Sequence, residues 1–154
     1  MKMDNRLMRM LHVLLHIALH DGAATSQTIA KMLGTHPVVV RRSMSNLREQ
    51  GYVQATRGPG GGWRLARALG EITVFDVYVT LGLPSLIAIE RHPEHPTCPV
   101  ERSVAAALDD VAMQAEAAML ARFKATTLAD LVPASTPAAK AKRGSGDMLA
   151  GHRH

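Results

Sequence analysis

The chain has 154 residues, a formal net charge of +5 at pH 7 and a single cysteine. One cysteine excludes an intrachain disulfide framework and is typical of a protein from a reducing cytosol. No apolar run reaches the roughly 18–20 residues of a membrane span, and the amino terminus does not resemble a signal peptide. We therefore expect a cytoplasmic protein with no membrane partner, made of one ordinary domain and an appendage.

The positive charge is concentrated in the first half of the chain. Residues 1–67 carry ten Lys and Arg against three Asp and Glu, a formal charge of +7. Residues 68–154 carry eight against ten, a formal charge of −2. This asymmetry predicts that the first half contacts a polyanion.

The first predicted element is a helix over residues 5–20. Its leucines and methionines recur at intervals of three and four residues, so it should supply one side of a small helical core. His12, His16 and His20 fall at four-residue spacing and would share a face. Such a row can hold a metal ion, but a zinc site usually needs further ligands. We prefer an ordinary polar stripe and assign no metal to these histidines.

Residues 24–67 carry the main functional prediction. Thr25 or Ser26 caps a short helix that ends at Gly34, and Pro37 begins a second helix. The three residues between the two helices are typical of a helix-turn-helix motif.

The second helix of this motif has two different faces. Val40, Met44 and Leu47 recur at intervals of four and three residues and should pack inward. The rest of its surface is mostly basic or small, and comprises Val38, Arg41, Arg42, Ser45 and Arg48.

A β-hairpin is predicted after Gly51, with strands over 52–56 and 63–65. Its tip is the basic, glycine-rich sequence RGPGGG at 57–62. A helix-turn-helix followed by such a hairpin predicts a winged helix, so the fold class is mainly α with a small β-hairpin wing. A winged helix used only for protein contacts is the alternative, and we disfavour it because the basic residues lie where a duplex would be.

A further short helix should follow the wing, with Thr73 as its N-cap and Asp76 at its third position. Its apolar residues predict that it packs on the winged domain. Gly82 and Pro84 end it, and residues 83–90 form either a short strand or a linker.

The loop HPEHPTCP at 92–99 contains three potential metal ligands. His92, His95 and Cys98 are each separated by two residues, a spacing that metal ligands can have. No fourth ligand is evident, so we prefer that Thr97 or Cys98 caps the next helix and that the histidines are solvated. Cys98 stays a candidate redox or effector residue, because a thiol at a helix N-terminus can be reactive.

Residues 99–125 are predicted to form a single long helix. Apolar residues step by threes and fours along one face from Val100 to Phe123. At about 1.5 Å per residue the helix would be about 40 Å long, more than a small winged core can cover. The simplest partner for this stripe is a second copy, which gives a twofold dimer. A short capped turn is expected at 127–131, and it would fold over this interface.

These elements predict four segments in the chain. They are a winged helix-turn-helix DNA-binding domain over 1–82, a linker loop over 83–98, a dimerisation helix with its capping turn over 99–132, and a disordered tail over 133–154. An enzyme is not expected, since no nucleophile–base pair or carboxylate pair is evident and the glycine loop lacks the pattern of a phosphate-binding loop.

In a dimer, the two basic helices would enter successive major grooves about 34–36 Å apart on a pseudo-palindromic site. Arg41 and Arg42 are candidates for base-edge or phosphate contacts, and Val38 for contact with a thymine methyl group. Ser26 and Gln27, at a helix N-terminus, suit phosphate contacts. The wing would approach the sugar–phosphate chain or a minor groove. The predicted DNA-binding residues are Ser26, Gln27, His36, Val38, Arg41, Arg42, Arg57, Gly60 and Arg64.

The wing sequence RGPGGGWRLA at 57–66 resembles that of the Rrf2 family of bacterial transcriptional regulators, the IscR, NsrR and CymR type. Flanking features also resemble the family, and the match covers roughly residues 5–132. Among these features are Ile29-Ala30 in the first helix of the helix-turn-helix and Ile72-Thr73 at the start of the helix that follows the wing. The resemblance implies a dimeric winged-helix repressor or activator whose long helices cross to form the dimer.

Cluster-binding members of this family are similar in the loop before the long helix but place three cysteines there. The corresponding positions in this chain are His92, Cys98 and Val104. The resemblance therefore implies the cluster-free branch, with no iron–sulfur cofactor. It also implies double-stranded DNA and a second copy as partners, with an unidentified small-molecule or redox effector.

Overall fold

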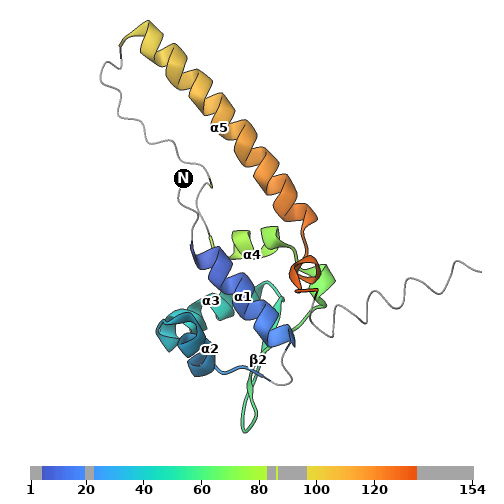
Figure 1. Ribbon diagram of the computed structural model, residues 1–154. Helices are drawn as coiled ribbons and strands as arrows, with labels where there is room; N and C mark the ends of the chain where they lie inside the picture. The colour runs from blue at the N-terminus through green and yellow to red at the C-terminus, as the bar shows by residue number, and fades with distance from the viewer. Residues whose placement is uncertain (1–4, 20–22, 83–85, 87–96, 135–154) are drawn as a thin grey trace, which may run out of the picture.

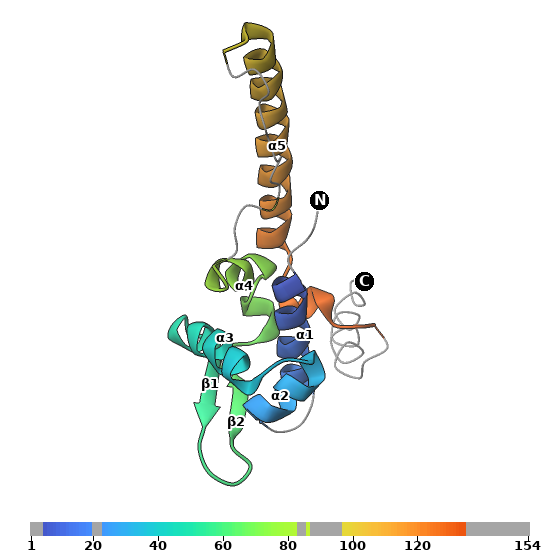
Figure 2. The same ribbon diagram turned by 90° about the vertical axis from the view of Figure 1, so that its left-hand side faces the viewer.

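The computed structural model describes residues 5–19, 23–82, 86 and 97–134. A compact body carries a β-hairpin at one end, and a single long helix projects from the other end (Figures 1 and 2). The predicted fold class is confirmed, namely a mainly helical winged helix-turn-helix with a hairpin wing and a long C-terminal helix. The elements are α1 (Asn5–Leu19), α2 (Ser26–Leu33), α3 (Pro37–Glu49), β1 (Val53–Thr56), β2 (Gly62–Leu65), the 3-10 turn η1 (Leu69–Glu71), α4 (Val74–Thr80), α5 (Pro99–Ala125) and the 3-10 turn η2 (Leu128–Leu131).

One apolar core holds the compact body together. Helix α1 supplies one side of it, as its periodicity predicts, and no polar or charged side chain of the described residues is buried with it. Fully burying an aliphatic side chain contributes about 1.5–3 kcal/mol, so this cluster fixes how the helices pack. Its fully buried members are Val13, Leu14, Ile29, Val40, Met44, Leu47, Val53, Ile72, Val77 and Leu128.

Local capping sets the bounds of the helix-turn-helix, as predicted. The Thr25 hydroxyl accepts the backbone N–H of Thr28 at 3.1 Å and begins α2. Gly34 ends it in the left-handed conformation, with φ of 59°, which glycine adopts at low cost. Pro37 is the first residue of α3, and the Nδ1 atom of His36 accepts the backbone N–H of Val38 at 3.4 Å.

The wing is an antiparallel pair in which Ala55 faces Trp63 and Thr56 faces Gly62. Gly62 thus belongs to the second strand and not to the tip. The backbone of Ala24, just before α2, adds a bridge outside the pair: its N–H and C=O bond to Trp63 at 3.1 and 2.9 Å. A Cβ atom at Gly62 would lie 2.7 Å from the Ala24 oxygen, so this close approach of two backbones needs glycine.

Helix α4 begins with the predicted capping box, in which Thr73 and Asp76 bond each other's backbone N–H. It connects the winged body to α5, because the Tyr78 ring packs edge-on against the Phe123 ring with centroids 6.0 Å apart. After α5 the chain returns to the core. Leu128 is fully buried there, and its N–H donates to the Ile72 oxygen at 2.8 Å.

Most of α5 stands clear of the compact body. None of its residues is buried, and Val100, Val104, Leu108 and Val111 are 72, 54, 45 and 63 % exposed. Its apolar stripe is thus open over most of its length. The predicted stripe runs to Phe123, but at this C-terminal end it is covered by the protein's own body, because Phe123 packs on α4.

Some predictions fall outside the described residues. These include His20, His92, His95, most of the 83–98 loop and the tail from 135 onward. Within the described part of the chain, no helix combines the length and apolar character needed to cross a membrane.

Candidate nucleic-acid interface

The solvent face of α3 carries the predicted base-reading residues. Arg41 and Arg42 are exposed, and Val38 is 57 % exposed. On the opposite face Met44 and Leu47 are fully buried, so the core fixes which side of the helix turns outward. Neither guanidinium has a hydrogen bond or ion pair with another described residue, which leaves both available for a phosphate or a guanine edge.

The N-terminal turn of α2 carries the second group. Gln27 is exposed, whereas Ser26 is half-buried, and its hydroxyl oxygen accepts the indole N–H of Trp63 at 2.9 Å. The Ser26 hydroxyl keeps its own proton for donation to a phosphate oxygen. This bond was not predicted from the sequence, although a buried indole N–H generally needs an acceptor.

The wing supplies the third group, and Arg57, Gly60 and Arg64 are all exposed. The N–H of Gly61 donates to the oxygen of Gly58 at 2.9 Å. Gly60 has a φ of 72° and follows Pro59, which is the residue order of a type II turn. The tip is therefore a defined turn that carries Arg57 at its base.

Arg67, at the base of the wing, was not among the predicted residues. Its Nε donates to the oxygen of Gly51 at 3.1 Å, and its guanidinium lies 5.1 Å from the centre of the Tyr52 ring. Burial first, and then hydrogen bonding and the charge of Asp76, raise the pKa of Tyr52 above its ordinary value of 10.0, and Arg67 lowers it in part. Arg67 thus joins the end of α3 to the end of the wing, a contact that sequence spacing does not indicate.

All three groups lie at the same end of the molecule. Helices α2 and α3 and the hairpin cluster there, and the free end of α5 points the opposite way (Figure 2). The structure therefore brings the elements that carry the predicted DNA-binding residues together at one end. Cys98 is not part of this group, since it lies at the start of α5 (Figure 1).

The residues present do not fit a three-cysteine iron–sulfur site. Cys98 is the single cysteine, half-buried at the N-cap position of α5. Val104, at a corresponding ligand position, carries an exposed aliphatic side chain. The rings of His12 and His16 lie 4.5 Å apart, but no group of three or more His, Cys, Asp or Glu side chains suited to a metal occurs among the described residues.

Known proteins resemble this chain in sequence and in fold. Residues 3–134 match the model of the Rrf2 family, described as iron-dependent transcriptional regulators. The protein named as HTH-type transcriptional regulator YwnA, from Bacillus subtilis, is 29 % identical over 130 residues, which are 84 % of this chain and 96 % of YwnA. Protein rrf2 of Nitratidesulfovibrio vulgaris is 30 % identical over 134 residues, 86 % of this chain and 87 % of that protein.

The fold has a counterpart in the solved structure of CymR, the global cysteine regulator of Bacillus subtilis. The two superpose with a TM-score of 0.61 at 21 % identity, over 85 % of this chain and 95 % of CymR. Together with the family match over 3–134, the winged helix identifies the type of protein. The chain belongs to the Rrf2 family of DNA-binding transcriptional regulators, and it is not an enzyme.

Proposed function

We propose that this protein is a dimeric repressor that reads a pseudo-palindromic operator with α3 and the wing. The observation that carries the proposal is the exposed basic face of α3, which the buried Met44 and Leu47 hold outward beside the basic wing. A helix presented in this way fits the major groove, while the wing lies along the adjacent backbone.

The predicted residues divide between two tasks on the duplex, base reading and phosphate contact. Arg41 and Arg42 lie in the N-terminal half of α3, the part of a recognition helix that approaches base edges. A guanidinium can bond guanine through two atoms and so read sequence. Ser26 contributes its hydroxyl proton to a phosphate, and Arg57 attracts the backbone from the base of the wing tip.

The dimer forms through α5. Val100, Val104, Leu108 and Val111 are each at least 45 % exposed, and they recur at intervals of four and three residues along one face. Each apolar Å² that a partner covers contributes about 25 cal/mol. A second copy is the natural partner because a twofold axis pairs the same stripe with itself.

The cofactor content and the effect on transcription are also part of what we propose. With one cysteine in the chain, we propose that the protein works without an iron–sulfur cluster and that Cys98 is its candidate effector residue. Repression follows if the dimer covers a promoter and excludes polymerase. Deleting the gene should then raise transcription of its targets, and a fall in that transcription would instead indicate an activator.

DNA binding is tested by titrating the protein against the duplex upstream of its own gene, beside a scrambled duplex, across a range of salt concentrations. Tighter binding to the upstream duplex than to the scrambled one, with a binding constant whose logarithm falls steeply with the logarithm of salt concentration, supports a regulator that neutralises several phosphates. Absence of binding to either duplex at low salt would favour the protein-interaction alternative.

A further inference from the structure

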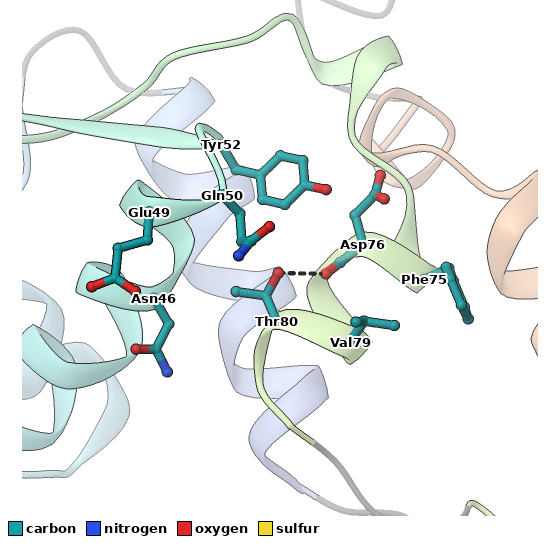
Figure 3. Close-up of a pocket in the computed structure, with 8 residues that line it drawn as sticks. All are labelled: Asn46, Glu49, Gln50, Tyr52, Phe75, Asp76, Val79 and Thr80. Carbon is teal, nitrogen blue, oxygen red and sulfur yellow. Dashed lines mark hydrogen bonds between the residues drawn. The ribbon is translucent and has the colours of Figure 1, made fainter.

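A pocket of about 290 Å³ lies between the C-terminal end of α3, the start of the wing and α4 (Figure 3). This volume is near the lower end of the range of small-molecule sites, about 300–1,000 Å³. None of the predicted DNA-binding residues contributes to it. The pocket is lined by Asn46, Glu49, Gln50, Tyr52, Phe75, Asp76, Val79 and Thr80.

The charge of this lining is opposite in sign to the formal charge of the N-terminal half of the chain. Two carboxylates, Glu49 and Asp76, line the pocket without any Lys, Arg or His, although residues 1–67 carry a formal charge of +7. The last carbonyl groups of α3 add the negative end of its dipole. The pocket therefore repels DNA phosphates and favours a cation.

The α4 wall of the pocket is fixed by its own hydrogen bonds. One carboxylate oxygen of Asp76 accepts the N–H and the hydroxyl of Thr73, both at 2.8 Å. The hydroxyl of Thr80 donates to the backbone oxygen of Asp76 at 2.8 Å, the bond drawn in Figure 3. A ligand would meet this wall as a preformed surface.

The α3 wall differs, because its polar side chains are open to a ligand. The side chains of Asn46, Glu49 and Gln50 are exposed and make no hydrogen bond to another described residue. They offer one carboxylate and two amide oxygens as acceptors. Tyr52 reaches across from the wing toward Asp76 (Figure 3), and Val79, which is 55 % exposed, adds apolar surface.

We propose that this pocket binds a small aliphatic amine and that its occupation alters DNA binding. A primary ammonium group has three N–H donors, and the acceptors that we assign to them are the exposed Glu49 carboxylate and the amide oxygens of Asn46 and Gln50, which follow one another at helical spacing of three and one residues. The short alkyl chain packs on Val79. The regulatory half of this inference rests on the proposed function, whereas the binding half does not.

The position of the pocket explains how a ligand would act on DNA. One wall is the C-terminal end of α3, and the other is α4. Helix α4 in turn contacts α5 through the Tyr78 and Phe123 rings. An amine that bonds to the α3 wall and packs on Val79 of the α4 wall favours one position of α3 relative to α5, and a ligand shifts an equilibrium between two such positions by its difference in affinity for them.

Binding is tested on the full-length protein without DNA, with 1,4-diaminobutane as the probe and 1,4-butanediol as its uncharged match. Amide NMR should show saturable shifts at Gln50, Tyr52 and Val79 with the diamine only. Glu49→Gln should weaken binding roughly tenfold, because it removes a charge-assisted hydrogen bond. Val79→Trp, which fills the pocket, should abolish it.

Asp110→Asn is the matched control, since Asp110 is an exposed carboxylate on α5 outside the pocket. It should bind the diamine like the parent. Equal affinity in the parent and Glu49→Gln would overturn the inference, and so would equal shifts with the diol. Neither result depends on whether the protein binds DNA.

Regulation is tested by adding the diamine to the parent and to Glu49→Gln on the upstream duplex. The diamine competes for phosphates equally in both, so only the difference between them reports on the pocket. We expect the diamine to change the parent's affinity for the duplex at least roughly fivefold more than it changes that of Glu49→Gln. Equal changes would overturn the regulatory half, whereas failure to bind DNA without diamine would contradict the proposed function and remove the regulatory half with it.

Discussion

Trp63, on the second strand of the wing, donates its indole N–H to the hydroxyl of Ser26, in the first turn of α2, at 2.9 Å. The backbone of Trp63 also bonds that of Ala24 in both directions. These contacts join the wing to the helix-turn-helix as one unit. A rigid unit holds the wing arginines and the α3 arginines at a fixed spacing, which a groove and its neighbouring backbone require.

Replacing Ser26 tests this junction. Ser26→Ala leaves the indole N–H of a buried Trp63 without its acceptor, and should lower the free energy of unfolding by about 1–2 kcal/mol. Urea denaturation of Ser26→Ala, Trp63→Phe and the double variant gives the coupling energy between the two residues. Strictly additive effects would mean that the bond contributes nothing.

Gly62 provides a second test, because it lies where two backbones meet. Gly62→Ala places a Cβ atom 2.7 Å from the Ala24 oxygen at a φ of 146°, and should destabilise the protein by about 2 kcal/mol or more. Gly70→Ala is the control, since nothing lies within 4 Å of its added Cβ. Equal urea midpoints for the two variants would contradict the close approach.

Arg41 and Arg42 are expected to determine sequence preference. Arg41→Ala or Arg42→Ala should reduce discrimination between operator and random duplex by about 1–3 kcal/mol if the guanidinium bonds a guanine through two atoms. Competition binding with both duplexes measures this. If the affinity for both duplexes falls equally, the arginine contacts phosphate alone.

Arg57 is expected to act through charge. Arg57→Ala should weaken binding to both duplexes and reduce the salt slope by about 1, because one phosphate contact is lost. The slope is read from affinities at several salt concentrations. An unchanged slope would remove Arg57 from the interface.

The exposed stripe of α5 is expected to hold the dimer. Leu108→Asp places a charge in the stripe and should yield monomers in sedimentation velocity, with weaker operator binding. Met113, which is 67 % exposed, lies on the opposite side of the helix by its spacing, so Met113→Asp should remain dimeric. Dimers in Leu108→Asp would place the interface elsewhere.

Local signals in the sequence were sufficient for much of the fold. Thr25, Gly34 and Pro37 mark helix ends because capping depends on residues only a few positions apart. The Thr73 and Asp76 pair is equally local. The face of α3 was predictable because its apolar periodicity matches the helical repeat.

Contacts between distant segments were not predictable in this way. The Trp63–Ser26 bond spans 37 positions, and Leu128 joins the core only because the chain folds back after α5. The pocket likewise depends on packing between α3 and α4. The four predicted segments and the individual DNA contacts stay predictions, which the variants above test.

Selection from a random duplex library is the most direct test of dimeric, sequence-specific DNA binding, because it needs no assumption about the operator. A twofold dimer with one α3 in each major groove should enrich an inverted repeat, with half-sites about 10 base pairs apart from centre to centre. Leu108→Asp, if monomeric, should lose this symmetry. A pool that stays random, or one that enriches a single half-site with the parent protein, would contradict a dimeric, sequence-specific regulator.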